Sequence, residues 1–143
     1  DIVEYSGGYS PVPGKILFGG PMMGIAQYTD EAVTDKRNNG IVVLTEEEAK
    51  PAEVYPCIRC GECVEKCPMQ LEPLYLEKAS SSENWDVARD YYVTQCIECG
   101  LCSYVCPSKR PLAEYIRYGK RTVMAQDRVA AEQAKAEQAK EEK

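Results

Sequence analysis

The eight cysteines of the 143-residue chain fall into two runs with the spacing C-x2-C-x2-C-x3-C, each followed directly by proline. The two runs consist of Cys57, Cys60, Cys63 and Cys67, and of Cys96, Cys99, Cys102 and Cys106. Cysteines at this spacing ligate cubane [4Fe–4S] clusters. Because each such cluster takes up or releases one electron at a time, the doubled motif predicts two [4Fe–4S] clusters and electron transfer. We assign no catalytic side chain.

The ligands of the two clusters are predicted to cross between the runs. In proteins with two such clusters, the fourth cysteine of one run binds the cluster of the other run. The resulting sets are Cys57, Cys60, Cys63 and Cys106 for cluster I, and Cys96, Cys99, Cys102 and Cys67 for cluster II. Three cysteines in one loop fit around one corner of a cube, whereas the fourth starts a helix that leads toward the partner. We therefore expect metal binding to be coupled to folding.

The two runs also form an internal repeat with an offset of 39 residues. Ile58 and Ile97 match, and we expect each to give its cluster an apolar wall. Gly61 and Gly100 also match, and glycine permits the positive φ that lets a backbone wrap closely around a cluster. The duplication predicts a core with pseudo-two-fold symmetry and one cluster on each side.

Zinc and disulfide bonds are the alternatives to iron–sulfur clusters. Structural zinc sites usually take two well-separated C-x2-C pairs per ion, a plan that does not explain the third and fourth cysteines of each run. Cysteines so close together in a tight loop do not meet the geometry of a disulfide easily. The sequence contains no histidine, which excludes Rieske-type ligation and histidine-based zinc sites.

Composition limits the other functions of the chain. The net charge is −6 before the negative charge of the clusters is added, so nucleic acid is not expected as a partner. Free thiolates and iron indicate a reducing compartment. No apolar stretch approaches the length of a membrane span. The chain begins with aspartate rather than methionine, and we expect it to be part of a longer protein.

Residues 1–50 are rich in glycine and in residues that favour strands, and residues 15–18 and 41–45 are predicted strands. We interpret this segment as the end of a β-rich domain. The loop Gly19-Gly20-Pro21-Met22-Met23-Gly24 lacks the spacing of known nucleotide-binding loops. We interpret it as a turn that packs both methionines inward.

Residues 51–123 contain the cluster repeat and are predicted to be helical between and after the runs. We expect a short helix over residues 73–79, and a second one that begins with a capping box at Ser80 and Glu83. The apolar stripe of that second helix would be Trp85, Ala88 and Tyr92. Helices between the runs favour an all-helical ferredoxin module over the small ferredoxins built from β-hairpins.

A further helix is predicted after the second run. Pro111 suits its first turn, and apolar residues follow at helical spacing: Leu112, Tyr115, Ile116 and Val123. Residues 124–143 form a tail rich in alanine, glutamate and lysine, which we interpret as a solvated helix because it has no apolar seam. A docking arm for a partner is the alternative. The fold class predicted for the whole chain is α+β.

Three tyrosines lie near the cysteine runs in the sequence, namely Tyr91, Tyr92 and Tyr104. Packing is the favoured interpretation of these side chains, and electron relay is the alternative.

The chain resembles the C subunit of the Rnf complex. The resemblance rests on residues 18–24 (FGGPMMG), on residues 56–63 (PCIRCGEC) and on the end rich in alanine, lysine and glutamate. It covers essentially the whole chain as the C-terminal part of that protein. The resemblance implies that residues 1–50 end a soluble ligand-binding β-grasp domain, that residues 51–123 form a helical double-cubane domain, and that residues 124–143 are a charged tail.

Rnf complexes are membrane-bound and exchange electrons between ferredoxin and NAD while they pump sodium ions or protons. The resemblance therefore implies a peripheral protein on the cytoplasmic face of the membrane. Its partners would be the other subunits and ferredoxin or another one-electron centre. FMN and NAD(H) would bind only to an upstream part that is missing here. Two alternatives remain, a cobalamin reductase subunit of bacterial microcompartments with the same motifs, and a module that uses a metal only to hold its shape.

Overall fold

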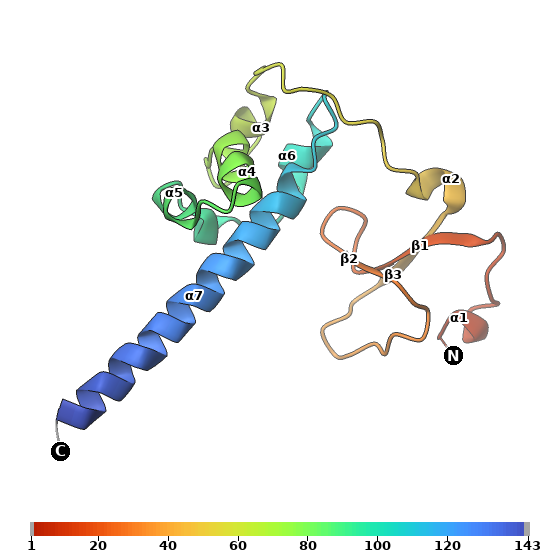
Figure 1. Ribbon diagram of the computed structural model, residues 1–143. Coiled ribbons are helices and arrows are strands. Elements are labelled where there is room, and N and C mark those ends of the chain that lie inside the picture. The colour runs from red at the N-terminus through yellow and green to blue at the C-terminus, as the bar shows by residue number, and fades with distance from the viewer. Residues whose placement is uncertain (1, 142–143) are drawn as a thin grey trace. The chain divides into compact units, whose positions relative to one another are not determined.

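The computed structural model describes residues 2–141, with the side chains of residues 139–141 left out. The chain divides into two compact units, one up to Glu53 and one from Val54 onward. Figure 1 shows strands in the first unit and helices in the second. The α+β class predicted from the sequence is confirmed.

The N-terminal unit is built on a three-stranded antiparallel sheet with the order β2-β1-β3. The strands are β1 (Pro13–Phe18), β2 (Ile25–Gln27) and β3 (Ile41–Thr45), and two short helices flank them, α1 (Ile2–Tyr5) and α2 (Glu46–Ala49). β1 and β3 confirm the two predicted strands. Leu17, in the central strand, pairs with Ala26 on one side and Val42 on the other, and it is 7% exposed.

A capping box that sequence reasoning missed starts α2. The Thr45 hydroxyl accepts a hydrogen bond from the Glu48 backbone N–H at 3.3 Å. The Glu48 carboxylate accepts one from the Thr45 backbone N–H at 2.9 Å. Without these bonds, both backbone N–H groups would lack a hydrogen-bond acceptor within the helix. The Thr45 hydrogen bonds, chiefly the one from its backbone, lower the pKa of Glu48 below its ordinary value of 4.5.

The glycine-rich loop between β1 and β2 is a closed turn. The Gly24 backbone N–H donates to the Gly20 carbonyl at 2.8 Å, and a Cβ at Gly24 would lie 2.4 Å from that oxygen. Position 24 therefore requires glycine, because the backbone of Gly20 lies too close to it for a side chain. The prediction that both methionines pack inward is wrong, because Met22 is 43% and Met23 55% exposed. A turn that closes on its own backbone leaves these side chains outside.

All the regular elements among the described residues of the C-terminal unit are helices. Its elements are α3 (Glu62–Glu65), α4 (Pro73–Ser81), α5 (Trp85–Asp90), the 3-10 helix η1 (Val93–Gln95), α6 (Leu101–Tyr104) and α7 (Leu112–Glu141). The first residues of α3 and α6 are 39 positions apart, as are those of α4 and α7, so the cysteine repeat is also a repeat of helices. α3 packs on α6, and α4 packs on α7.

A very close approach of α4 and α7 joins two residues that are equivalent in the repeat. Ser80 of α4 is fully buried, and its hydroxyl contacts no hydrogen-bond partner in the described part of the chain. A Cβ on Gly119 of α7 would lie 2.1 Å from the Ser80 Oγ atom. Equivalent residues that face each other in this way lie on the pseudo-two-fold axis of the unit.

Two details of the predicted second helix are wrong. Ser80 does not cap it, because Ser80 lies inside α4 at the helix crossing. The cap is Asn84, whose side chain accepts a hydrogen bond from the Val87 backbone N–H at 3.3 Å. Tyr92 does not extend the apolar stripe, because the helix ends at Asp90 and Tyr92 has a φ of 57°. That side chain is 66% exposed, whereas Ala88 is fully buried.

One apolar core lies between the helices of this unit. Its buried members are Leu71, Leu76, Ala79, Ala88, Val93, Leu112, Ile116 and Val123. Cysteines of both runs pack against it, namely Cys63, Cys67, Cys96, Cys102 and Cys106. The core and the cysteine loops are therefore one packed structure, in which burial of apolar surface and metal ligation depend on each other.

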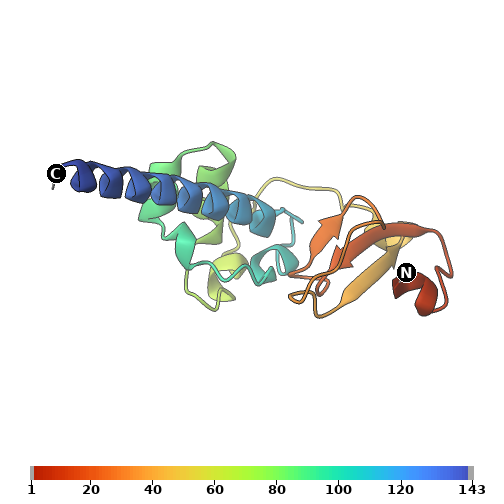
Figure 2. The same cartoon turned by 90° about the horizontal axis from the view of Figure 1, so that it is seen from below.

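Helix α7 is 30 residues long and extends well past the other helices of its unit (Figure 2). Arg89 of α5 holds it at Asp127 and Gln126, with nitrogen–oxygen distances of 3.0 and 2.8 Å. Residues 124–138 are exposed, as expected of a solvated helical tail. The last two residues of the predicted tail lie outside the described residues.

Candidate cluster-binding sites

The two cysteine loops have the same backbone conformation. Gly61 and Gly100 have φ values of 85° and 78°, which confirms the predicted left-handed positions. Two further pairs were not predicted, because none of their members is glycine. Arg59 and Glu98 have φ values of 55° and 57°, and Gln70 and Lys109 have values of 54° and 51°. Left-handed backbone is uncommon outside glycine, so its recurrence at equivalent positions marks a loop shape held by its surroundings.

The left-handed residues direct backbone N–H groups at cysteine sulfur. The Arg59 N–H donates to the Cys57 Sγ atom at 3.4 Å, and the Glu98 N–H donates to the Cys96 Sγ atom at 3.4 Å. The Leu71 N–H, directly after a left-handed residue, donates to the Cys67 Sγ atom, also at 3.4 Å. Such bonds stabilise negative charge on thiolate sulfur and are one means by which proteins tune clusters.

A small, almost wholly apolar cavity lies beside the second loop. Its lining contains four cysteines, Cys67, Cys96, Cys99 and Cys102. Leu71, Leu76 and Ile116 contribute apolar walls, and Ile97 lines it as expected from the sequence. These four cysteines come from both runs and are the predicted ligands of cluster II.

Hydrogen bonds also join the two segments that carry the other four cysteines. The Ser108 hydroxyl donates to the Pro56 carbonyl at 3.0 Å, and the Tyr55 N–H donates to the Ser108 carbonyl at 3.0 Å. These bonds fasten the start of the first run to the end of the second. Burial raises the pKa of the Cys63 thiol, and the neighbouring charges of Cys106, then Cys60 and Cys57, raise it further.

Burial also governs the thiols of the second loop. It raises the pKa of Cys102 to about 12, with smaller contributions from the charges of Cys96 and Cys99. A buried thiolate without a cation is unfavourable, so such thiols keep their protons until metal binds and displaces them. The donor set therefore fits a group that brings its own positive iron atoms.

Among the side chains that the structure describes, no three of His, Cys, Asp or Glu converge on a point that would hold a single metal ion. A cubane differs from a single ion because its four thiolates bind four separate iron atoms at the corners of a cube. The wider spread of the cysteines around the cavity is compatible with such a group.

The two sites differ in exposure. Cys57 and Cys60 are exposed, whereas the remaining six cysteines are partly buried. Ile58, the expected apolar wall of the first site, is 69% exposed. The first loop therefore faces solvent more openly than the second.

The three tyrosines near the runs have different surroundings. Tyr91 stacks on Tyr75 with ring centroids 5.3 Å apart, which confirms packing for that residue. Tyr92 and Tyr104 are 66% and 71% exposed, so the packing favoured from the sequence is wrong for both.

Sequence reasoning missed three charged residues at the second loop. Glu98 lies between two cysteines of that loop, and Arg117 and Lys120 reach it from α7. In a sequence, these three charged residues look like the alternating charges of any exposed helix. Only a comparison with the equivalent positions in the first half of the repeat could have indicated their role.

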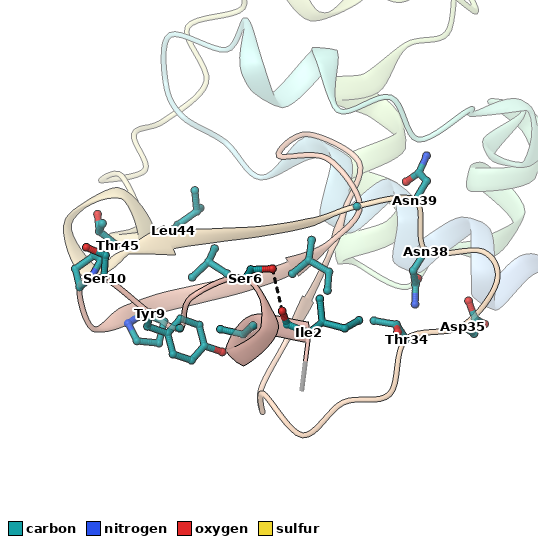
Figure 3. A pocket seen from close by; sticks show the side chains of 17 residues that line it. Ile2, Ser6, Tyr9, Ser10, Thr34, Asp35, Asn38, Asn39, Leu44 and Thr45 are labelled. Atoms are coloured by element: carbon teal, nitrogen blue, oxygen red, sulfur yellow. Dashed lines mark hydrogen bonds between the residues drawn. The ribbon is translucent and has the colours of Figure 1, made fainter.

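The N-terminal unit has a separate pocket of about 640 Å³ between α1, β3 and the loop before β3 (Figure 3). Its lining mixes apolar residues such as Ile2 and Leu44 with polar ones such as Asn38 and Asn39. The Ser6 hydroxyl donates to the Ile2 carbonyl at 2.9 Å across its wall. Among the described residues, no cysteine and no residue of the glycine-rich loop lines this pocket.

Comparisons with known proteins also indicate iron–sulfur clusters. The family described as "4Fe-4S dicluster domain" matches residues 56–110, which contain both cysteine runs. The C subunit of the ion-translocating oxidoreductase complex of Methanosarcina acetivorans is 48% identical over 88% of this chain. The C subunit of the Na(+)-translocating ferredoxin:NAD(+) oxidoreductase complex of Acetobacterium woodii is 45% identical over 89% of it. Over most of its length, the chain is homologous to the C subunits of ion-translocating oxidoreductase complexes.

The resemblance stated from the sequence is thereby confirmed. The chain spans 28% and 29% of the length of these two relatives. A third relative, from Clostridium ljungdahlii, is named proton-translocating; it is 41% identical over 95% of this chain, and the matched part is 29% of the relative. Relatives of similar identity thus bear names with different ions, and similarity does not identify an ion for this chain.

A second dicluster family matches residues 22–72, a range that contains only the first cysteine run. Both matches therefore describe cysteines of the same set of eight, which suffice for two [4Fe–4S] clusters. No helix among the described residues is long and apolar enough to cross a membrane.

Proposed function

We propose that this chain is the electron-transfer portion of a membrane-associated ferredoxin:NAD oxidoreductase. When bound, each [4Fe–4S] cluster supplies a centre that takes up or releases one electron. The eight cysteines would hold the two clusters in the crossed sets, with Cys57, Cys60, Cys63 and Cys106 at one and Cys96, Cys99, Cys102 and Cys67 at the other. The observation that carries the proposal is the cavity whose lining has four cysteines drawn from both runs.

The residues of the chain have three tasks in this role. The thiolates fix the positions of the clusters, and the backbone N–H groups of Arg59, Glu98 and Leu71 stabilise negative charge at the sulfur atoms. Leu76 and Ile116 keep water away from the second site. A rigid and dry setting of this kind lowers the structural change that accompanies each electron transfer.

The names of the relatives support a proposal for the wider setting. The name of the Acetobacterium woodii relative includes ferredoxin and NAD. We propose the same donor and acceptor, other subunits as immediate partners, and a peripheral position on the cytoplasmic face of the membrane. FMN and NAD(H) would bind to a part of the full protein outside this sequence.

The number and type of clusters are tested first on anaerobically reconstituted protein. Iron and sulfide analysis should give two [4Fe–4S] clusters per chain, and dithionite should bleach the brown colour and produce an EPR signal. Zinc in a colourless protein, or a cluster that dithionite does not reduce, would show a structural role for the metal instead.

The crossed ligation is tested in a background that keeps only one cluster site. A variant with serine at Cys57, Cys60 and Cys63 should retain one cluster. In this background, Cys67→Ser should abolish or alter the remaining EPR signal. The matched Cys106→Ser change should leave the signal intact. The reverse outcome would show that each run ligates its own cluster and would reject the assignment.

A further inference from the structure

A group of three charges fastens the second cysteine loop to α7. The Arg117 Nε atom donates to the Glu98 carboxylate at 2.9 Å. The Lys120 Nζ atom lies 3.3 Å from the other Glu98 oxygen and donates to the Cys96 carbonyl at 2.6 Å. The Lys120 ammonium is thus bound directly to the backbone of a cluster-site cysteine, and Glu98 holds it in that position.

These charges are poorly exposed. The side chains of Arg117, Lys120 and Glu98 are 18%, 19% and 26% exposed. Water and salt screen charges at such positions less than charges on an open surface. Their field therefore acts on neighbouring groups more strongly than that of the fully exposed charges farther along α7.

The first half of the repeat lacks this arrangement. The position equivalent to Lys120 is Ser81, and the position equivalent to Glu98 is Arg59, which is exposed. Because the two loops share one backbone conformation, the loop shape does not require the ammonium. Its presence at only one of two equivalent sites points to a property in which the two clusters differ.

The charge of Lys120 also reaches the sulfur of the loop. The ammonium is bound to the Cys96 carbonyl, and the Cys96 Sγ atom also accepts the hydrogen bond from the Glu98 backbone N–H at 3.4 Å. A positive charge that stabilises the thiolate also stabilises extra negative charge on a group bound to it.

We propose that Lys120 is a positioning residue that raises the reduction potential of the cluster at the second loop relative to the cluster at the first. The inference rests on the proposed function. On reduction, the second cluster would gain one electron. The donor, which is the first cluster or an external reductant, would lose one electron. No bond would form and no proton would move. The ammonium favours the reduced state because that state is more negative by one charge.

The test is an EPR-monitored redox titration of the reconstituted full chain, with the signal of the second cluster assigned from the single-site background described above. Lys120→Met removes the charge and keeps the apolar stem. At a fixed potential near the midpoint, the ratio of reduced to oxidised second cluster should fall about tenfold, which corresponds to about 59 mV for one electron. The midpoint of the first cluster should not change.

Three matched variants separate charge from structure. Lys120→Arg keeps the charge. At the same fixed potential, its ratio of reduced to oxidised second cluster should stay within about threefold of that of the unmodified chain. Lys120→Gln keeps a hydrogen-bond donor without the charge and should shift the midpoint as Lys120→Met does. It serves as the test variant if the Lys120→Met protein does not hold both clusters. Lys135→Met removes the same charge from an exposed position on α7 and should change neither midpoint.

An unchanged second midpoint in Lys120→Met and Lys120→Gln would overturn the inference, as would equal shifts of both clusters or the same shift in Lys120→Arg. In those cases the two clusters are still present, and the proposed function stands. Absence of two reducible clusters in the unmodified chain would instead reject the proposed function.

Discussion

The contact between Ser80 and Gly119 gives a quantitative test of how the two halves of the cluster unit pack. The perturbation is Gly119→Ala on α7. The added Cβ would lie 2.1 Å from the Ser80 Oγ atom and 2.9 Å from the Ser80 Cβ atom. Rotation of the hydroxyl relieves only the first overlap, so the two helices must also move apart.

The expected cost follows from two opposing effects. Overpacking of a well-packed core costs about 1–3 kcal/mol. Replacement of glycine by alanine inside a helix recovers about 1 kcal/mol. Because Ser80 is fully buried and cannot move into solvent, we expect the upper part of the range and a net loss of about 1–2 kcal/mol. For a unit of this size the midpoint of thermal unfolding should fall by roughly 5–15 °C.

The assay is anaerobic urea unfolding of the cluster-loaded chain, followed by far-UV circular dichroism and by visible absorbance. The matched control is the double variant Ser80→Gly/Gly119→Ala, which lacks both Ser80 side-chain atoms that the new Cβ would overlap. The double variant should recover most of the stability lost in Gly119→Ala, as a coupling between touching residues requires. A stable Gly119→Ala variant, or strictly additive effects, would refute the proposed contact on the pseudo-two-fold axis.

Four further predictions concern the helix cap, a buried ion pair and the metal of the chain. Thr45→Ala should cost the N-terminal unit about 1 kcal/mol through loss of the capping box. Because the pKa of Glu48 is lowered in the folded state, its stabilisation is complete above pH 4.5 and is lost as the pH falls further. Glu48→Gln should therefore flatten the acid limb of the stability profile. Glu77→Ala should cost about 2–3 kcal/mol in chemical denaturation, since it leaves Arg110, its partner at 2.7 Å, with a charge only 25% exposed. Removal of iron by a chelator should reduce the helical circular dichroism signal of the C-terminal unit while β-structure persists, because the cysteines pack against its core. A fully helical metal-free chain would contradict this.

Local patterns were predicted well where short-range chemistry decides the structure. The strands β1 and β3 follow from turn residues and β-branched residues, and the left-handed Gly61 and Gly100 follow from glycine. The helix α4 begins at Pro73, a residue suited to the first helical turn. The misplaced cap has a physical cause. Ser80 and Glu83 match the sequence pattern of a capping box. In the structure, however, Ser80 is a small residue at a helix crossing, and Asn84 provides the cap.

The positions of the cysteines alone determine the kind and number of cofactors, because the reach of a tight loop around a cube depends on residues only a few positions apart. Only the tertiary structure decides what surrounds those cofactors. Lys120 meets the Cys96 carbonyl across 24 residues because α7 packs against the second loop, and nothing in the local sequence requires that contact. The repeat makes the two sites alike in backbone, and side chains distant in sequence make them electrically different.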